Sequence, residues 1–281
     1  MFISLITLNT GIIPRESHKS GIKAYIEKTL ESKKISPIEY KNLLASNPKA
    51  FADLINESTV NETYFFREEK QFALLKERHF PQWRALFGLS PIKIWSAACS
   101  YGEEAYSLAL LAKECNINIQ ITASDINSEV LDHCKKGIFL ASSIRQMDGL
   151  SFQHLFRPYE TKDRLIDFPQ EFKNLIQTRQ INLSQIDSPQ VEPFLPKNQN
   201  IVFLRNVFIY FNQELRARIL KTISEKCLAD DGLLFVSMSE IAQLDQAVMP
   251  PSLEKVMDGN VFYFHKTSAS SKNEGKFFKE L

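Results

Sequence analysis

The chain has 281 residues, of which 44% are hydrophobic and 24% are charged, and its net charge is +1. These values are typical of a globular protein with one large domain or two modest ones, and they exclude a molecule whose overall charge binds polyanions such as nucleic acid. No apolar stretch is long enough to cross a membrane, and the apolar start lacks the basic region and cleavage site of a signal peptide. We therefore expect a cytoplasmic protein without membrane insertion.

The four cysteines are widely spaced and include no CxxC pair. This spacing argues against a zinc site or a disulfide framework and favours a reducing compartment. The sequence therefore predicts no metal site. The cysteines are Cys99, Cys115, Cys134 and Cys227.

Residues 1–60 are predicted to form a small all-helical domain. In SPIEYKNLLAS, Ser36 is placed as a helix N-cap, Pro37 occupies the first helical position and Glu39 follows three residues after the cap. NPKAFADLINE repeats this design from Asn47. Between residues 1 and 50, eight lysines and arginines face four glutamates, which gives a charge of 8 − 4 = +4. This charge indicates either a surface that attracts an acidic partner or an ordinary solvated helical face.

Residues 61–90 are predicted to be a linker followed by a connecting helix that ends before Pro81. The linker contains NETYFFRE, an unusual mixture of polar and aromatic residues. In an extended segment Asn61, Thr63 and Arg67 would share one face. Phe65 would fall on that face too, so either Phe65 packs near a ligand or the segment is not simply extended.

Residues 91–266 alternate between strand and helix patterns, which predicts an α/β fold with a parallel, doubly wound sheet. Strands are predicted at IKIWSAAC, IQITASD, NIVFLRN and DGLLFVSMS, with NVFYFHK as a final edge strand. The alternation breaks after Ile138, where SIRQMDGLSFQHLF is predicted to be helical and residues 154–180 to form a small antiparallel β-subdomain. Residues 267–281 are rich in Ser and Lys and are predicted to be a mobile tail.

The first predicted strand runs into AACSYGEE, a turn of small residues that allows a ligand to approach the backbone closely. In a doubly wound sheet, ligands bind beyond the carboxyl ends of the strands. After Gly102, Glu103 and Glu104 open the next helix, and acidic residues at that position disfavour a pyrophosphate. Since GxGxxG is also missing, the turn favours a ligand with a positive charge or sugar hydroxyls over a dinucleotide.

The second strand ends at Asp125, 125 − 102 = 23 positions after Gly102. A carboxylate at about this spacing commonly accepts hydrogen bonds from ribose hydroxyls. The alternative is a helix N-cap, a role that Asn127 could share. The third strand ends at Arg205-Asn206, where polar side chains would meet the open edge of the sheet.

Several motifs together resemble one known family in order and spacing: NETYFFRE, WSAACSYGEEAYSLA, ASDINSEVLDHCKKGIF, INL, FLRNVFIYF and DGLLFVSMSE. This is the CheR family of chemotaxis receptor glutamate methyltransferases, which use S-adenosylmethionine and release S-adenosylhomocysteine. The resemblance covers most of the chain. It implies a class I (Rossmann-like) methyltransferase domain with a small N-terminal all-helical domain and a small antiparallel β-subdomain.

The resemblance also implies site residues. Arg67 and Tyr210 are expected near the reacting groups, with Arg67 also touching the cofactor, while Phe65 and Phe66 anchor the linker in the core. Glu103 is expected to bind the methionine amino group and Asp125 the ribose. The complete set of expected cofactor-binding residues is Asn61, Thr63, Arg67, Glu103, Asp125, Asn182, Leu183, Arg205 and Asn206.

The implied substrate is a long helical chemoreceptor with acidic methylation sites, which the +4 segment would suit. Some family members bind a receptor C-terminal peptide by strand addition. Here FRPYETKDRLIDFPQEF lacks the glycines associated with that loop, and Pro158 and Pro169 limit strand pairing. We therefore expect no peptide tether, and a monomer. Two alternatives stay open: a class I methyltransferase with another substrate, and a non-catalytic signalling module that binds S-adenosylmethionine.

Overall fold

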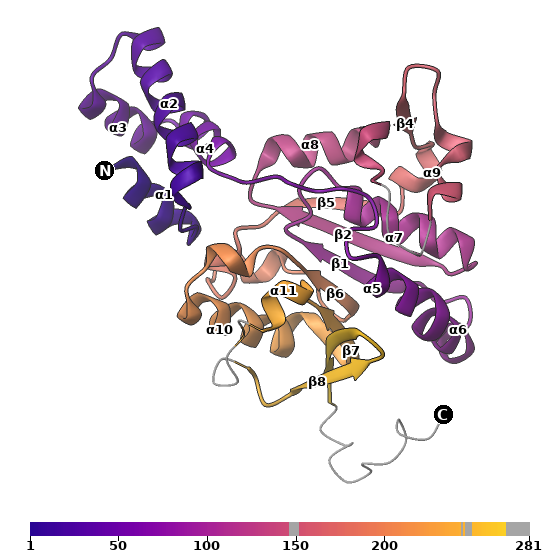
Figure 1. Cartoon of the computed structure of the whole chain (residues 1–281). Coiled ribbons are helices and arrows are strands. Elements are labelled where there is room, and N and C mark those ends of the chain that lie inside the picture. Colours follow the sequence, from indigo (N-terminus) through magenta and orange to yellow (C-terminus); the bar gives the residue numbers. More distant parts are fainter. Residues whose placement is uncertain (146–151, 243, 245–248, 268–281) are drawn as a thin grey trace.

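The computed structural model describes residues 1–145, 152–242, 244 and 249–267 (Figure 1). A seven-stranded sheet has the order β5-β2-β1-β6-β7-β9-β8. The first five strands of this order are parallel, and β9 is antiparallel to both of its neighbours. The strand bounds are β1 Ile92–Ala97, β2 Ile119–Asp125, β5 Ile176–Gln180, β6 Gln199–Leu204, β7 Leu228–Phe235, β8 Leu253–Asp258 and β9 Val261–Lys266. The predicted class I methyltransferase fold is confirmed.

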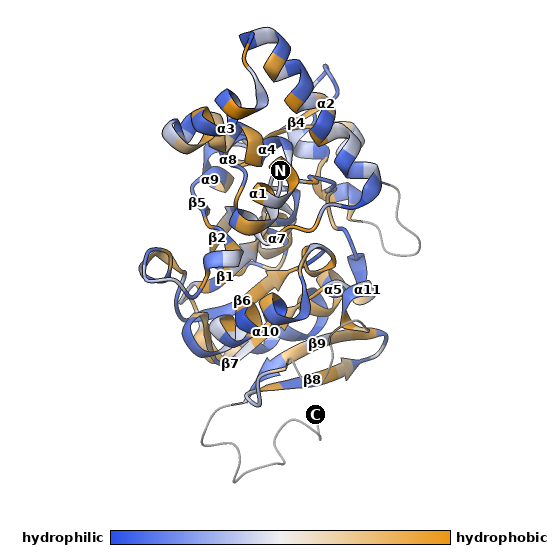
Figure 2. Ribbon diagram, turned by 90° about the vertical axis from the view of Figure 1, so that its left-hand side faces the viewer, coloured by the Kyte–Doolittle hydropathy of each residue, from blue (hydrophilic) through white to orange (hydrophobic). Residues whose placement is uncertain are grey.

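Both faces of the sheet are covered, because neighbouring strand residues point into different cores. In β1, Ile92 and Ile94 enter one core, whereas Trp95 and Ala97 enter the other. Figure 2 shows the apolar residues concentrated in the central strands and on inward helix faces. The strand order reverses between β1 and β6, so the carboxyl ends of these two strands form the switch point at which ligands bind. The covering helices include α7 Glu103–Glu114, α8 Ser128–Lys136 and α10 Gln213–Thr222.

A separate helical unit precedes the sheet and lies to one side of it in Figure 1. Its own apolar core includes Ile6, Ile22 and Tyr40. The predicted capping box is present, since the Ser36 side chain accepts from the Glu39 amide and the Glu39 carboxylate accepts from the Ser36 amide at 2.7 Å. The helices are α1 Phe2–Thr10, α2 Glu16–Lys33, α3 Pro37–Ser46 and α4 Pro48–Glu57.

The connecting helix does not end before Pro81. It runs as α5 Glu69–Leu74, a π-helical turn Leu75–His79 and α6 Phe80–Phe87. Pro81 lies in the first turn of α6, directly after the wider π turn in which the Phe80 amide bonds the Leu75 carbonyl. The register change frees the position that a proline ring would otherwise block, so the helix continues through it.

The predicted β-subdomain at 154–180 is wrong at both ends. The antiparallel pair consists of β3 Ile138–Leu140 and β4 Leu165–Asp167, whereas β5 joins the main sheet beside β2. Strands of three residues are too short to show a periodicity, and a parallel partner is set by long-range contacts. Part of the helix predicted at SIRQMDGLSFQHLF, residues 146–151, lies outside the described residues, and its described flanks Ala141–Ser143 and Gln153–Leu155 form single 3-10 turns.

The final strand β9 is not at the edge of the sheet, because β8 pairs on its outer side. The β8 sequence LEKVMD has only Leu253 fully buried, so its apolar pattern is too weak to predict a strand. Residues 268–281 of the predicted tail lie outside the described residues. Among the residues that the structure describes, no helix has the length and apolarity needed to cross a bilayer.

Candidate active site

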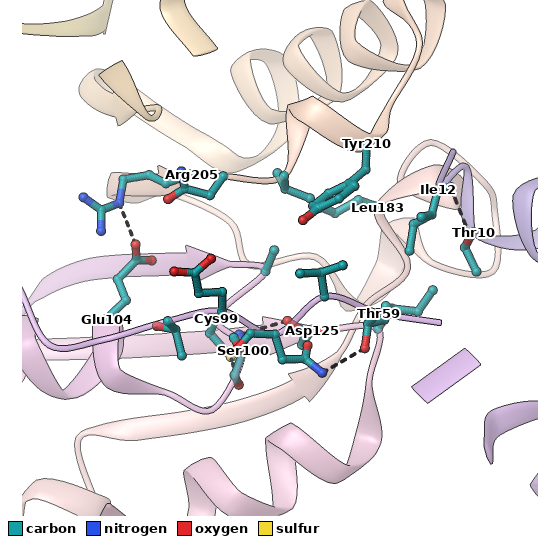
Figure 3. Close-up of a pocket in the computed structure, with 18 of the residues that line it drawn as sticks. Thr10, Ile12, Thr59, Cys99, Ser100, Glu104, Asp125, Leu183, Arg205 and Tyr210 are labelled. Carbon is teal, nitrogen blue, oxygen red and sulfur yellow. Dashed lines mark hydrogen bonds and ion pairs between the residues drawn. The ribbon is translucent and has the colours of Figure 1, made fainter. Parts of the chain in front are cut away.

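A cavity lies at the carboxyl ends of β1, β2 and β6, beneath the linker and the first helix (Figure 3). It encloses about 880 Å³ of empty space, including solvent at its mouth, which is within the range of small-molecule sites. Nine of the ten residues expected at the site line it: Asn61, Thr63, Arg67, Asp125, Asn182, Leu183, Arg205, Asn206 and Tyr210. Segments that are far apart in the sequence therefore meet at the predicted edge of the sheet.

The turn after β1 is fixed against the end of β2. Asp125 accepts hydrogen bonds from the backbone amides of Ser100 at 2.9 Å and Asn127 at 3.0 Å. Burial raises the pKa of Asp125, and these amide hydrogen bonds act in the opposite direction. The N-cap of α8 is Asn127, whose side chain accepts from the amides of Glu129 and Val130. The capping alternative for Asp125 is therefore excluded, and its carboxylate lines the cavity.

Of the two glutamates that open α7, the second lines the cavity, whereas Glu103, which was expected at the site, is not among the lining residues. Glu103 is 4% exposed and accepts from Ser143 Oγ at 3.2 Å, while its other carboxylate oxygen has no hydrogen-bond partner. Glu104 lines the cavity instead. Successive helical residues point about 100° apart, so the two side chains have different surroundings. A sequence alone does not decide which one lines the cavity.

Glu104 forms a buried ion pair with Arg205, whose Nε donates to the Glu104 carboxylate at 2.8 Å. Figure 3 shows this pair at one end of the cavity, with Thr10 and Ile12 at the opposite end. Arg205 Nη1 also donates to the Arg67 carbonyl at 2.6 Å and to the Gln71 side chain at 2.9 Å. One guanidinium therefore joins β6, the start of α7 and the linker.

The loop after β6 carries Tyr210 and is anchored by a buried carboxylate. Glu240 accepts from the amides of Asn206 at 2.7 Å and Ile209 at 3.2 Å, and its side chain is fully buried. Burial raises the pKa of Glu240, and these amides oppose the shift. Asn206 has a left-handed φ of 57°. Its backbone amide is held by Glu240, and its side-chain Nδ2 donates to Ser237 Oγ at 3.1 Å.

The linker is not simply extended. Phe66 and Glu68 have left-handed φ values of 54° and 58°, so the chain turns between its polar residues. Phe65 points away from the cavity and packs against Phe139 and Phe156, with ring centroids 5.0 and 4.8 Å apart. Phe66 is buried as well. Both phenylalanines anchor the linker in the core, as the resemblance implied.

No motif in the sequence indicated that the N-terminal helical domain contributes to the cavity. Thr10 and Ile12 line it, and Asn182, which would by itself be read as a turn residue, donates to the Asn9 carbonyl at 2.7 Å. Thr59 and Cys99 are further lining residues that sequence reasoning missed. The available signal was Gly11, a left-handed C-cap between two apolar segments, but a cap does not reveal what it lies against.

The family model for the CheR methyltransferase, SAM binding domain, matches residues 61–263. The chain belongs to the CheR family. A chemotaxis protein methyltransferase 2 of Pseudomonas aeruginosa is 31% identical over 82% of this chain and 81% of its own length. A chemotaxis protein methyltransferase of Escherichia coli is 30% identical over 84% of this chain and 81% of its own length. One of Borreliella burgdorferi is 28% identical over 90% of this chain and 92% of its own length.

S-adenosylmethionine is accordingly the cofactor of this CheR domain, and the cavity has donors and acceptors suited to it. The partly buried carboxylate of Glu104 suits the methionine ammonium, and Asp125 suits the ribose hydroxyls. The apolar side chains of Ile126 and Leu183 offer surfaces for the adenine. The cavity thus combines carboxylates with apolar walls, as a cationic nucleoside requires.

Because Glu103 is buried, we expect the free energy of unfolding to depend on pH. Burial raises its pKa to about 7 from an ordinary value of 4.5. Because the folded state then binds a proton that the unfolded state has released, the free energy of unfolding should fall by up to about 3 kcal/mol as the pH rises from about 4.5 to about 7. Urea unfolding at several pH values, compared with Glu103→Gln, measures this. The variant should lack this component of the slope and be more stable than the wild type at pH 7.5; identical pH profiles would contradict the prediction.

Proposed function

We propose that this protein transfers a methyl group from S-adenosylmethionine to glutamate side chains of chemoreceptor cytoplasmic helices, forming methyl esters in chemotaxis adaptation. The observation that carries the proposal is the convergence of the linker, three strand ends and Tyr210 on one cavity in a CheR domain. The relatives named above support the chemotactic setting, since each is a chemotaxis protein methyltransferase. The protein would act in the cytoplasm and as a monomer.

The reaction requires mainly placement. S-adenosylmethionine supplies a methyl group on a positively charged sulfur, and transfer forms a carbon–oxygen bond to the carboxylate while the carbon–sulfur bond breaks and its electron pair stays on sulfur. A glutamate carboxylate is already ionised at neutral pH, so the chain need not provide a general base. Its residues hold the two reactants in line and limit access of water.

Two residues at the mouth are proposed to act on the reacting groups. Arg67, whose Nη1 donates to the Glu62 carbonyl at 2.8 Å, would orient the acceptor carboxylate, and Tyr210 would contribute a hydrogen bond beside the methyl group. Since the carboxylate loses its charge in the reaction, a strong arginine contact aids binding more than rate.

We expect Tyr210→Phe to lower kcat by about tenfold, equivalent to the loss of one hydrogen bond, with the affinity for S-adenosylmethionine retained. Steady-state methylation rates and calorimetry measure the two quantities. Unchanged turnover would remove the hydrogen-bonding role. For Arg67→Ala, a loss confined to cofactor affinity, with turnover intact at saturating cofactor, would remove its role toward the acceptor.

We further propose that receptors are bound without a C-terminal peptide tether. Pro158 lies in a 3-10 turn and Pro169 is the N-cap of the short helix α9, Gln170–Lys173, so neither presents a free strand edge. β3 and β4 form the whole of the small sheet that the structure describes. Measurable calorimetric binding of receptor C-terminal peptides would overturn this proposal.

The function is tested by incubating the protein with methyl-labelled S-adenosylmethionine and chemoreceptor cytoplasmic fragments. Label that is released by mild alkali marks glutamate methyl esters and supports the proposal. Alkali-stable label would indicate a class I methyltransferase acting on another kind of group. Cofactor binding without transfer would indicate a non-catalytic module.

A further inference from the structure

The carboxylate of Glu68, at the end of the linker, is bound to the segment that follows β7. It accepts hydrogen bonds from Ser237 Oγ and, at 3.1 Å, from the backbone amide of Met238, which begins the short helix α11, Met238–Ile241. Ser237 is fully buried, and the two donors are 169 and 170 positions away from Glu68 in the sequence. The Glu68 side chain therefore fixes the linker to α11 by a tertiary contact.

This contact also holds the backbone on which Arg67 is carried. Glu68 has a left-handed φ of 58°, a conformation that residues other than glycine seldom adopt. One residue earlier, the Arg67 carbonyl accepts from Arg205 Nη1 at 2.6 Å. Arg205 thus holds one side of this tight backbone turn, and α11 holds the other. The turn places Arg67 in the lining of the cavity.

Ser237 extends the network to the loop that carries Tyr210. Its Oγ accepts from Asn206 Nδ2 at 3.1 Å while it donates to Glu68. The backbone amides of Asn206 and Ile209 both donate to Glu240, and Ile209 directly precedes Tyr210. One set of hydrogen bonds therefore runs from the linker, through the start of α11, to the loop after β6.

We propose that Glu68 is a positioning residue for methyl transfer, whose carboxylate sets Arg67 and the Tyr210 loop in register with each other. The inference rests on the proposed function, because it assumes that these two residues act on the acceptor and on the methyl group. In a reaction that needs its reactants in line, a displacement of about 1 Å can cost about 100-fold in rate. Loosening the network at Glu68 should therefore slow the transfer step.

The same change should leave cofactor binding nearly intact. Asp125 is oriented by the amides of Ser100 and Asn127, and Glu104 is oriented by Arg205 Nε. None of these hydrogen bonds involves Glu68. A fall in the transfer rate without a matching fall in cofactor affinity is thus the signature of a positioning role, and general damage to the cavity would change both.

The test compares Glu68→Ala, Glu68→Gln and Glu77→Ala, the last of which removes an exposed carboxylate of the π turn outside the cavity lining. Single-turnover rates are measured with saturating S-adenosylmethionine and receptor fragment, and the affinity for S-adenosylhomocysteine is measured by calorimetry. Glu68→Ala should lower the rate by about 10- to 30-fold, with the Kd within about threefold of the wild type. Glu68→Gln should recover most of the rate, because its amide can accept from Met238 and donate to Ser237 Oγ. Glu77→Ala should match the wild type.

Ser237→Ala is a second, independent variant, since it removes the hydroxyl that links Glu68 to Asn206. Residues that act through one network have non-additive effects. The double variant Glu68→Ala, Ser237→Ala should therefore be about as slow as the slower single variant, whereas independent effects would multiply. If Glu68→Ala does not fold, Ser237→Ala decides the inference: a slower transfer with an unchanged Kd supports it, and a wild-type rate overturns it.

Four results would overturn the inference while leaving the proposed function intact. They are a wild-type rate in folded Glu68→Ala, a loss of rate that Glu68→Gln does not recover, a parallel loss of cofactor affinity, and multiplied losses in the double variant. If the wild-type chain transfers no alkali-labile label to any receptor fragment, the proposed function itself fails.

Discussion

Asp125→Asn is expected to weaken S-adenosylmethionine binding by about 10- to 100-fold. Hydrogen bonds to a charged acceptor contribute about 1.5–3 kcal/mol, and an amide oxygen replaces the carboxylate with a neutral and weaker acceptor. Asp125 is 8% exposed and accepts from the amides of Ser100 and Asn127, so its orientation toward the cavity is already set before ligand binds. Isothermal calorimetry with S-adenosylmethionine and S-adenosylhomocysteine measures the loss.

The control for this prediction is Asp132→Asn on α8, an exposed carboxylate outside the cavity lining that pairs with Lys135 at 3.0 Å. It should bind the cofactor like the wild type. Asp125→Asn also weakens two hydrogen bonds from backbone amides and can lower the stability of the protein. Cofactor binding is therefore compared well below the thermal midpoint of each variant. A cofactor affinity within about threefold of the wild type, in a folded Asp125→Asn protein, would refute the ribose assignment.

The fold and the strand-end residues were predictable because they depend on local patterns. Short stretches of sequence are enough to identify buried strands, capped helices and a carboxylate at a fixed spacing from Gly102. The motifs that resemble the CheR family then identified the linker and Tyr210. Local propensity predicted three features wrongly. The edge of the main sheet and the β3–β4 pair depend on tertiary strand pairing, and the continuation of the helix through Pro81 depends on a π turn.

The site itself was harder to predict where two similar residues compete. Glu103 and Glu104 differ by a single position, and only the packing of α7 determines that one is sealed beneath the linker and the other faces Arg205. The contribution of Thr10 and Ile12 was missed for another reason. Contacts between two domains leave no periodic signal in either, so the first helix read only as part of a helical unit.

The ion pair between Glu104 and Arg205 leads to the prediction with the largest effect on stability. The two side chains are 12% and 2% exposed, and removing one partner of such a pair leaves a buried charge without compensation. We expect Glu104→Gln to lose about 3 kcal/mol in free energy of unfolding, which corresponds to a thermal midpoint about 10 °C lower. The loss of a carboxylate facing the methionine ammonium should also weaken cofactor binding by at least about tenfold.

The double variant Glu104→Gln, Arg205→Met separates these two effects. Arg205 lies 5.4 and 5.2 Å from the ring centres of Phe72 and Phe203, so a methionine there replaces the unpaired charge with apolar contact. Thermal unfolding should therefore recover a substantial part of the lost stability, although the Arg67 carbonyl and Gln71 lose a donor. Cofactor affinity should stay low, because the ammonium still lacks its carboxylate, whereas Glu103→Gln should bind normally. Restored binding in the double variant would show that Glu104 serves only to neutralise Arg205 and that another group holds the amino end.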